Sequence, residues 1–177
     1  MAVIHRATIA PTKAEVLERR LGSPVTVLGA YRFDDPEGQV GVEGFLLDAG
    51  GTVLHAVLTY RNAPLAGADA HLICTMEHSV LGTRWVYDGL GDPVALGCYD
   101  RALRGDQAQA TEEVWDGAER IQTREPTVRV TLVLPDGHDQ EAGVPVIATD
   151  PRESDGSRAH LLARWSGGTA IVAARGH

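Results

Sequence analysis

Residues 25–60, VTVLGAYRFDDPEGQVGVEGFLLDAGGTVLHAVLTY, decide the fold of this chain. Apolar residues alternate with polar or small residues along this stretch, and a period of two is typical of strands. Chain-reversal sequences interrupt the pattern at 34–38, DDPEG, where proline presets one backbone angle, and at 48–51, DAGG, where paired glycines tolerate positive φ. The stretch therefore predicts a three-stranded antiparallel meander.

The segment before the meander predicts one strand and one helix. Residues 2–9 alternate imperfectly and are soon followed by Pro11, which favours extended backbone in the residue before it. Thr12 and Glu15 have the spacing of a capping box, in which each side chain accepts a hydrogen bond from the backbone of the other residue. We expect a short amphipathic helix that begins after Thr12 and ends at Gly22.

Further strands and a second helix are predicted after the meander. Residues 71–79 and 83–89 are strand-like and are predicted to join the same sheet. Asp92 is the expected N-cap of the second helix, because its carboxylate can accept from a free backbone N–H, and Pro93 suits the first helical turn. This helix should end before Gly105. Its core candidates are Val94, Leu96, Cys98 and Leu103.

The C-terminal third is mostly strand-like. Residues 105–119 are acidic and leave two alternatives open, a short helix or a mobile surface segment. PDGHD at 135–139 is a predicted turn, and Gly167-Gly168 predicts the turn of a hairpin. The strand-like runs are 127–134, 144–150, 160–166 and 169–176.

This order of elements predicts an α+β fold in which helices pack against a curved antiparallel β-sheet. The regular strand–helix alternation of a doubly wound parallel sheet is missing. A chain of 177 residues fits one domain, 1–177, with a core that buries about 70% of the unfolded surface.

Composition narrows the expected partners and compartment. The formal net charge is -8 and Lys13 is the single lysine, so the whole chain lacks the basic surface that nucleic acids require. Cys74 and Cys98 have neither metal-site nor disulfide-framework spacing, which favours reduced, buried thiols. No apolar stretch approaches the roughly 18–20 residues that span a bilayer, and the N-terminus lacks a signal-peptide pattern. We expect a cytoplasmic protein that binds neither nucleic acid nor membrane.

The densest polar stretch is TMEHSVLGTRWVYDGLGDP, residues 75–93. It lacks zinc-site spacings and phosphate-binding glycine motifs, so no metal and no cofactor is expected. In a strand, Glu77 and Ser79 lie on one face and His78 on the other, so this triplet forms no catalytic relay by itself. Convergence of His78 with Glu77 or Asp88 across strands stays open as an acid–base alternative.

The structural interpretation of the same stretch is a half-buried strand. Its aromatic residues lie on one face, with Arg84 and Asp88 on the other. A buried Arg84 would require a carboxylate partner, which Glu77 or Asp88 would supply. We expect no catalytic residue here. The candidate ligand or partner surface comprises Glu77, His78, Arg84, Trp85, Tyr87 and Asp88.

A family resemblance rests on IHRATIAPTKAEVLERRL at 4–21 and TYRNAPLAGADAHLICTMEHSVLGTRWVYDGLGDPV at 59–94. These stretches resemble the N-terminal cap domain of actinobacterial maltokinases. The resemblance covers most of residues 2–104 and little beyond residue 105. It implies an α+β, cystatin-like fold, with the catalytic residues in a separate kinase lobe for which 177 residues leave no room.

Our leading hypothesis is therefore a stand-alone, cap-like domain without enzymatic activity. It would be a binding or regulatory module linked to a sugar or glycan kinase, with that kinase or another protein as partner and a small carbohydrate as a candidate ligand. One alternative is a small-molecule-binding protein or small enzyme that uses a pocket on the concave face of the sheet. Another is a structural homodimer that pairs edge strands or sheet faces.

Overall fold

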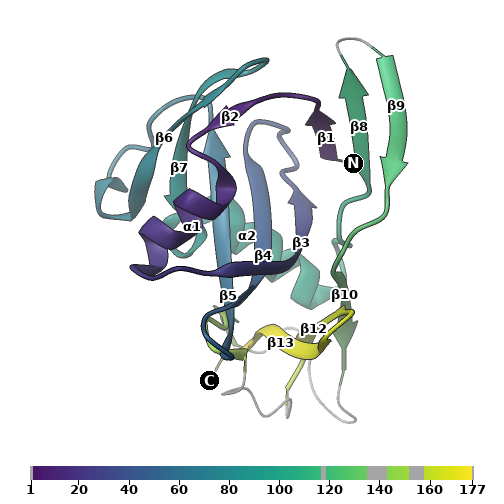
Figure 1. The fold of residues 1–177 in the computed structure, drawn as a ribbon. Helices are drawn as coiled ribbons and strands as arrows, with labels where there is room; N and C mark the ends of the chain where they lie inside the picture. The colour runs from purple at the N-terminus through teal and green to yellow at the C-terminus, as the bar shows by residue number, and fades with distance from the viewer. Residues whose placement is uncertain (1, 117–118, 135–142, 152–157, 177) are drawn as a thin grey trace.

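A computed structural model describes residues 2–116, 119–134, 143–151 and 158–176, and the strands within these ranges form three sheets (Figure 1). The largest is a curled antiparallel sheet with the strand order β2-β6-β7-β5-β4-β3. Its strands are β2 (Ile9–Ala10), β3 (Thr26–Asp34), β4 (Gly41–Asp48), β5 (Val53–Arg61), β6 (Leu72–His78) and β7 (Gly82–Asp88).

The predicted meander is confirmed as β3, β4 and β5. Its register places Gly44 of β4 opposite Tyr31 on one side and Val57 on the other. The hairpin of β6 and β7 joins the same sheet through antiparallel pairing of β7 with β5, as the sequence predicts. The predicted α+β class, a curved antiparallel sheet packed against helices, is therefore confirmed.

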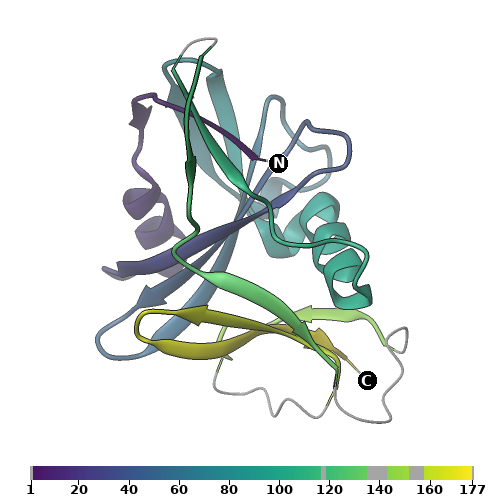
Figure 2. The same ribbon diagram turned by 90° about the vertical axis from the view of Figure 1, so that its right-hand side faces the viewer.

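The helices α1 (Lys13–Leu21) and α2 (Pro93–Arg104) lie on opposite faces of the six-stranded sheet (Figure 2). Strand alternation explains this, because successive side chains of β4 point to opposite faces. Phe45 packs with Leu17 of α1, whereas Leu46 packs in the cluster that contains Tyr99 of α2. The sheet is thus apolar on both faces, and each face has its own helix.

The start and end predicted for α1 and the start predicted for α2 are confirmed. The Thr12 side chain accepts from the Glu15 backbone while the Glu15 carboxylate accepts from the Thr12 backbone, and Gly22 ends α1 with a φ of 72°. Asp92 caps α2 by accepting from the Val94 N–H at 2.9 Å. Of the core residues predicted in α2, Cys98 and Leu103 are buried, while Val94 and Leu96 are partly buried against the core.

A four-stranded antiparallel sheet, in the order β10-β12-β13-β11, covers the α2 side of the molecule. Its inner residues Leu161, Ala163 and Val172 belong to the same buried cluster as Leu46 and Tyr99. One hydrophobic core therefore extends from the meander through α2 to the C-terminal strands. These are β10 (Arg129–Val133), β11 (Pro145–Ile147), β12 (His160–Trp165) and β13 (Gly168–Arg175).

Side chains occupy the edges where these two sheets meet. The Gln109 amide donates to the Val128 carbonyl at 2.7 Å and accepts from the Val130 N–H at 2.8 Å, in place of a neighbouring strand. The Thr127 hydroxyl accepts from the Ala30 N–H of β3 at 2.9 Å. An exposed row of backbone donors and acceptors invites edge-to-edge pairing, and these side chains satisfy part of it within the chain.

Three sequence predictions need correction. Residues 2–9 form two strands and not one, because β1 (Ala2–His5) pairs with β8 while β2 pairs with β6. For residues 105–119 the sequence left a short helix or a mobile surface segment open, whereas the described part contains β8 (Glu112–Asp116), which pairs with β1 and with β9 (Glu119–Arg124) in a third sheet.

The third correction concerns the C-terminal hairpin. Trp165 pairs with Gly168, so the turn residues are Ser166 and Gly167 and the glycine pair is shifted by one position from the prediction. Gly168 begins β13 instead. The predicted turn at 135–139 lies outside the described residues.

Candidate functional site

Three of the sequence-predicted site residues gather at the β6–β7 turn. The Glu77 carboxylate accepts from the Thr83 hydroxyl at 2.9 Å. His78 Nδ1 accepts from the backbone N–H groups of residues 80 and 81, and Arg84 donates to the Leu81 carbonyl at 2.6 Å. Arg84 is only half-buried, so the carboxylate partner expected for a buried Arg84 is not required, and its hydrogen bond is to a carbonyl. These contacts all lie within the hairpin.

The other three lie farther along β7. Trp85 is half-buried opposite Arg61 of β5. Tyr87 is buried, and its hydroxyl accepts from the Leu65 N–H at 2.8 Å, which fixes the loop before β6. Asp88 ends the strand, about 13 Å from Arg84 at the usual rise per strand residue. The six predicted residues therefore do not form one cluster, and Asp88 belongs to a different place from Glu77, His78 and Arg84.

Asp88 forms an ion pair with Arg20 at the end of α1, with 2.6 Å between a carboxylate oxygen and a guanidinium nitrogen. The Leu90 N–H also donates to Asp88 at 3.2 Å, where the chain turns from β7 into the short 3₁₀ helix η2 (Gly89–Gly91). Gly89 is needed at this turn, because a Cβ there would lie 2.4 Å from a Val57 methyl group. Asp88 is thus held in place by β7 and η2, and its side chain reaches Arg20 on the face of the sheet that α1 covers.

A hollow of about 290 Å³ lies on one side of the Arg20–Asp88 pair. It arises because β7 pairs with β5 only from Leu58 to Arg61, so that before residue 58 no strand of the described residues pairs with this edge of β5. The His55 N–H donates to the Thr149 carbonyl across this gap. We call this the first hollow. It is lined by Arg20, Leu21, Leu54, His55, Ala56, Val57, Asp88, Leu90, Ile147, Thr149 and Asp150.

A second hollow, of about 410 Å³, lies on the other side of the same pair. It is formed by the end of α1 and the short 3₁₀ helix η1 (Asp69–His71), which leads into β6. The His71 ring lies against η2, where a Cβ on Gly91 would be 2.0 Å from it. We call the two together the paired hollows. The second is lined by Arg19, Arg20, Ala70, His71, Leu72, Ile73 and Asp88.

A buried polar cluster on the α2 face of the sheet is centred on His55 of β5, which the sequence prediction did not single out. Its Nε2 lies 2.8 Å from the Tyr31 hydroxyl, and Nδ1 lies 2.7 Å from the Ala148 carbonyl. The Tyr31 hydroxyl is also 2.7 Å from the Tyr99 hydroxyl. Burial lowers the pKa of His55 to about 4. A strand-alternation argument could have found this residue, since His55 shares its face with the apolar Val57.

Glu43 of β4 is the centre of a second buried polar cluster, on the α1 face. Its carboxylate accepts from Lys13 at 2.7 Å, from Arg32 at 3.1 Å and from the Tyr60 hydroxyl at 3.1 Å. Burial acts to raise the pKa of Glu43, but Arg32 and Lys13 outweigh it and hold the pKa below its usual range. Burial also lowers the pKa of Lys13, with Glu43 acting in the opposite direction.

The Asp92 carboxylate forms a third cluster. Arg61 binds it through two nitrogens at 2.6 and 2.7 Å, and the Thr59 hydroxyl donates to it at 2.7 Å. Burial acts to raise the pKa of Asp92, and the hydrogen bonds from Arg61 and Thr59 outweigh it. With the cap to Val94, both carboxylate oxygens are engaged. Such a group holds a helix start to a strand and has little capacity left for a ligand.

No group of three or more His, Cys, Asp or Glu side chains that could hold a metal ion occurs among the residues that the structure describes. In the same part of the chain, no helix is long and apolar enough to cross a membrane.

A curled antiparallel sheet with a helix on each face and the paired hollows beside α1 define a small α+β domain. Residues 11–92, from just before α1 to the residue after η2, match the family model of the maltokinase N-terminal cap domain. The match ends where α2 begins, so α2 and the C-terminal strands lie outside it. Comparisons with curated proteins and with solved structures gave no match.

Proposed function

We propose that this chain is a non-catalytic binding module of sugar or glycan metabolism, and that the paired hollows are its ligand site. The family match supports the metabolic context, because residues 11–92 match a maltokinase cap domain. The location rests on one observation: the Arg20–Asp88 ion pair forms a wall shared by both hollows.

The other charged clusters are less suited to a ligand. Glu43 and Asp92 are buried and bonded on both carboxylate oxygens by side chains or backbone of the same chain. The Arg20 side chain, by contrast, is 32% exposed and that of Asp88 is 14% exposed. A ligand can therefore reach the Arg20–Asp88 pair, whereas access to the other clusters would require the core to open.

A small carbohydrate fits the chemistry of this wall. A sugar hydroxyl both donates and accepts hydrogen bonds, and an arginine beside an aspartate offers donors next to acceptors. Ligand pockets are mostly apolar with a few convergent polar groups. The first hollow has this character, since Leu54, Val57 and Ile147 line it together with the ion pair.

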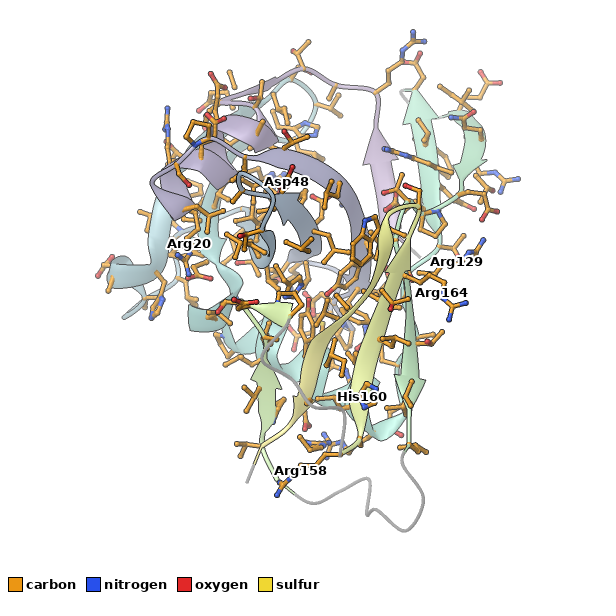
Figure 3. All side chains as sticks on the ribbon, turned by 60° about the horizontal axis from the view of Figure 1, so that its bottom comes forward. Arg20, Asp48, Arg129, Arg158, His160 and Arg164 are labelled. Carbon is orange, nitrogen blue, oxygen red and sulfur yellow. The ribbon has the colours of Figure 1, made fainter. Side chains whose placement is uncertain are left out.

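The test is an NMR titration of the ¹⁵N-labelled chain with glucose, maltose and maltotriose. Binding should shift the amide resonances of Asp88, Leu90 and Thr149 in a saturable manner. Arg20→Ala should abolish these shifts, while Arg129→Ala, an exposed arginine on the four-stranded sheet, should leave them unchanged. Figure 3 shows Arg20 of α1 and, across the molecule from it, Arg129. Saturable shifts elsewhere, or none with any sugar, would refute the proposed site.

A second candidate function, docking of a partner kinase, is favoured by the β6–β7 turn. Val80 and Leu81 are 51% and 45% exposed there, beside the charged side chains of Glu77 and Arg84. Apolar residues with a polar rim are typical of a protein contact. Light scattering of a mixture with a purified maltokinase tests it: a heavier species that Val80→Ser/Leu81→Ser removes supports docking, and a doubled mass without the kinase indicates the homodimer instead.

A further inference from the structure

We infer that the second hollow binds an anionic group of the ligand, a phosphate or a carboxylate, while the neutral part of the same ligand occupies the first hollow. This inference rests on the proposed function, because it names the chemical class of the ligand for the same site.

The charge of the side chains around the second hollow favours an anion. Arg19, Arg20 and His71 all line the second hollow, and Asp88 is the one carboxylate among its lining residues. Asp88 is already neutralised by Arg20 at 2.6 Å. Among the described residues Arg19 has no carboxylate within ion-pair distance; its side chain bonds the Cys74 thiol and interacts at longer range with Glu15. The hollow is therefore locally positive on a chain whose formal net charge is -8, and such a local field selects anions.

The positions of the hydrogen-bond donors around the second hollow also favour an anion. Guanidinium groups bind phosphate and carboxylate through paired, charge-assisted N–H···O bonds, which are stronger than bonds to neutral acceptors. Arg19 and Arg20 are consecutive in the last turn of α1, and His71 approaches from η1 on the other side of the hollow. The absence of a side chain at Gly91 gives the His71 ring its place against η2. Donors thus face the hollow from two separate elements.

The two hollows are lined by different kinds of side chain, which favours a ligand with two different ends. The first is lined mainly by aliphatic side chains, whereas the second is lined mainly by polar ones. Arg20 lines both hollows, so an anionic group bound by Arg20 is next to the neutral part of the ligand in the first hollow. A ligand with one charged end and one neutral, partly apolar end matches this arrangement.

Isothermal titration calorimetry with glucose, glucose 1-phosphate, glucuronate and inorganic phosphate tests the inference. Glucose 1-phosphate and glucuronate should bind at least about tenfold more tightly than glucose, since each adds a charge-assisted contact. Arg19→Ala should reduce affinity for the two charged sugars about tenfold and leave glucose unchanged. Arg129→Ala, which also removes one exposed arginine, should change neither. Because Arg19 is exposed, a thermal melt should show that Arg19→Ala folds normally.

The outcomes separate the inference from the proposed function. If glucose binds as tightly as glucose 1-phosphate and Arg19→Ala changes neither, the anion site is wrong and the sugar site stands. If no sugar binds, charged or neutral, the proposed function is wrong. Inorganic phosphate that competes with glucose 1-phosphate in wild type but not in Arg19→Ala supports the anion site. Equal weakening by Arg129→Ala would attribute the effect to overall charge and overturn the inference.

Discussion

The Tyr31 hydroxyl donates a hydrogen bond of 2.8 Å to His55 Nε2 at the centre of the molecule. The direction follows from the other ring nitrogen: the Ala148 carbonyl can only accept, so Nδ1 carries the proton, and a neutral ring leaves Nε2 as the acceptor. The Tyr99 hydroxyl then donates to the Tyr31 oxygen. This chain of bonds connects β3 and β5 to α2 and to the segment after β11.

Tyr31→Phe should destabilise the protein by about 1–3 kcal/mol, the usual cost of a buried polar group left without its partner. The substitution removes the donor to His55 and the acceptor for Tyr99 at once, inside a core where both are buried. Tyr99→Phe removes one donor only and should cost less, about 0.5–1.5 kcal/mol. Urea unfolding of both variants gives the comparison, and an equal loss for the two would contradict the central place of Tyr31 between His55 and Tyr99.

Stability should fall as the pH is lowered from about 6.5 to about 4. The pKa of His55 is lowered from 6.5 to about 4 by burial, so the unfolded chain binds a proton that the folded chain does not. Stability therefore decreases as the pH falls through this window, by roughly 3 kcal/mol for a shift of this size. Unfolding free energies measured at intervals of pH check this.

A non-titrating variant provides the control. His55→Gln should be less stable than wild type at pH 7 but should have a flatter profile between pH 4.5 and 6.5. The buried carboxylates do not obscure this window. Arg32 and Lys13 hold the pKa of Glu43 below its usual range, so its stabilising contribution is lost only at lower pH. A wild-type profile that is flat above pH 4.5 would show that His55 is not neutral and buried.

The elements that were predicted correctly depend on residues close together in the chain. Thr12 and Glu15 are three positions apart, and Asp92 directly precedes the helix that it caps, so local pattern contains the information. The meander is similar, because the period of its strands and the composition of its turns are both local. The local pattern does not fix a turn to a single residue, which is why the turn at Gly167 was predicted one position away from where it lies.

The parts that were missed depend on pairs that are distant in the chain. Asp88 was a candidate, but nothing near it in sequence indicates Arg20, 68 positions earlier, as its partner. His55 and Ala148 are likewise 93 positions apart. The β1–β8 pairing depends on the same kind of contact, since β8 has an acidic, uneven sequence and becomes a strand only beside its neighbours.

Glu43→Gln should be one of the most destabilising single substitutions of a charged residue here, by about 3–5 kcal/mol, because it leaves buried cationic groups without a carboxylate. Lys13 and Arg32 both bond Glu43. Lys13→Met should cost less, since Arg32 and Tyr60 still bond the carboxylate and the Lys13 side chain is 35% exposed. Guanidinium unfolding of the pair is the measurement. A larger loss for Lys13→Met would mean that the ammonium, and not the carboxylate, holds the cluster together.

Gly44→Ala should destabilise the sheet by about 1–3 kcal/mol, as overpacking of a filled core usually does. A Cβ at this position would lie 2.4 Å from the Tyr31 ring, whose hydroxyl is fixed by His55 and Tyr99, so the ring cannot yield without breaking those bonds. Gly41→Ala on the same strand is the matched control: its Cβ would approach Tyr60 at 3.3 Å, which a small shift can absorb. Thermal melts should therefore place Gly44→Ala well below Gly41→Ala. If Tyr31→Phe in the Gly44→Ala background costs less than in wild type, the methyl group acts by disturbing the Tyr31–His55 bond, because that bond is then already weakened.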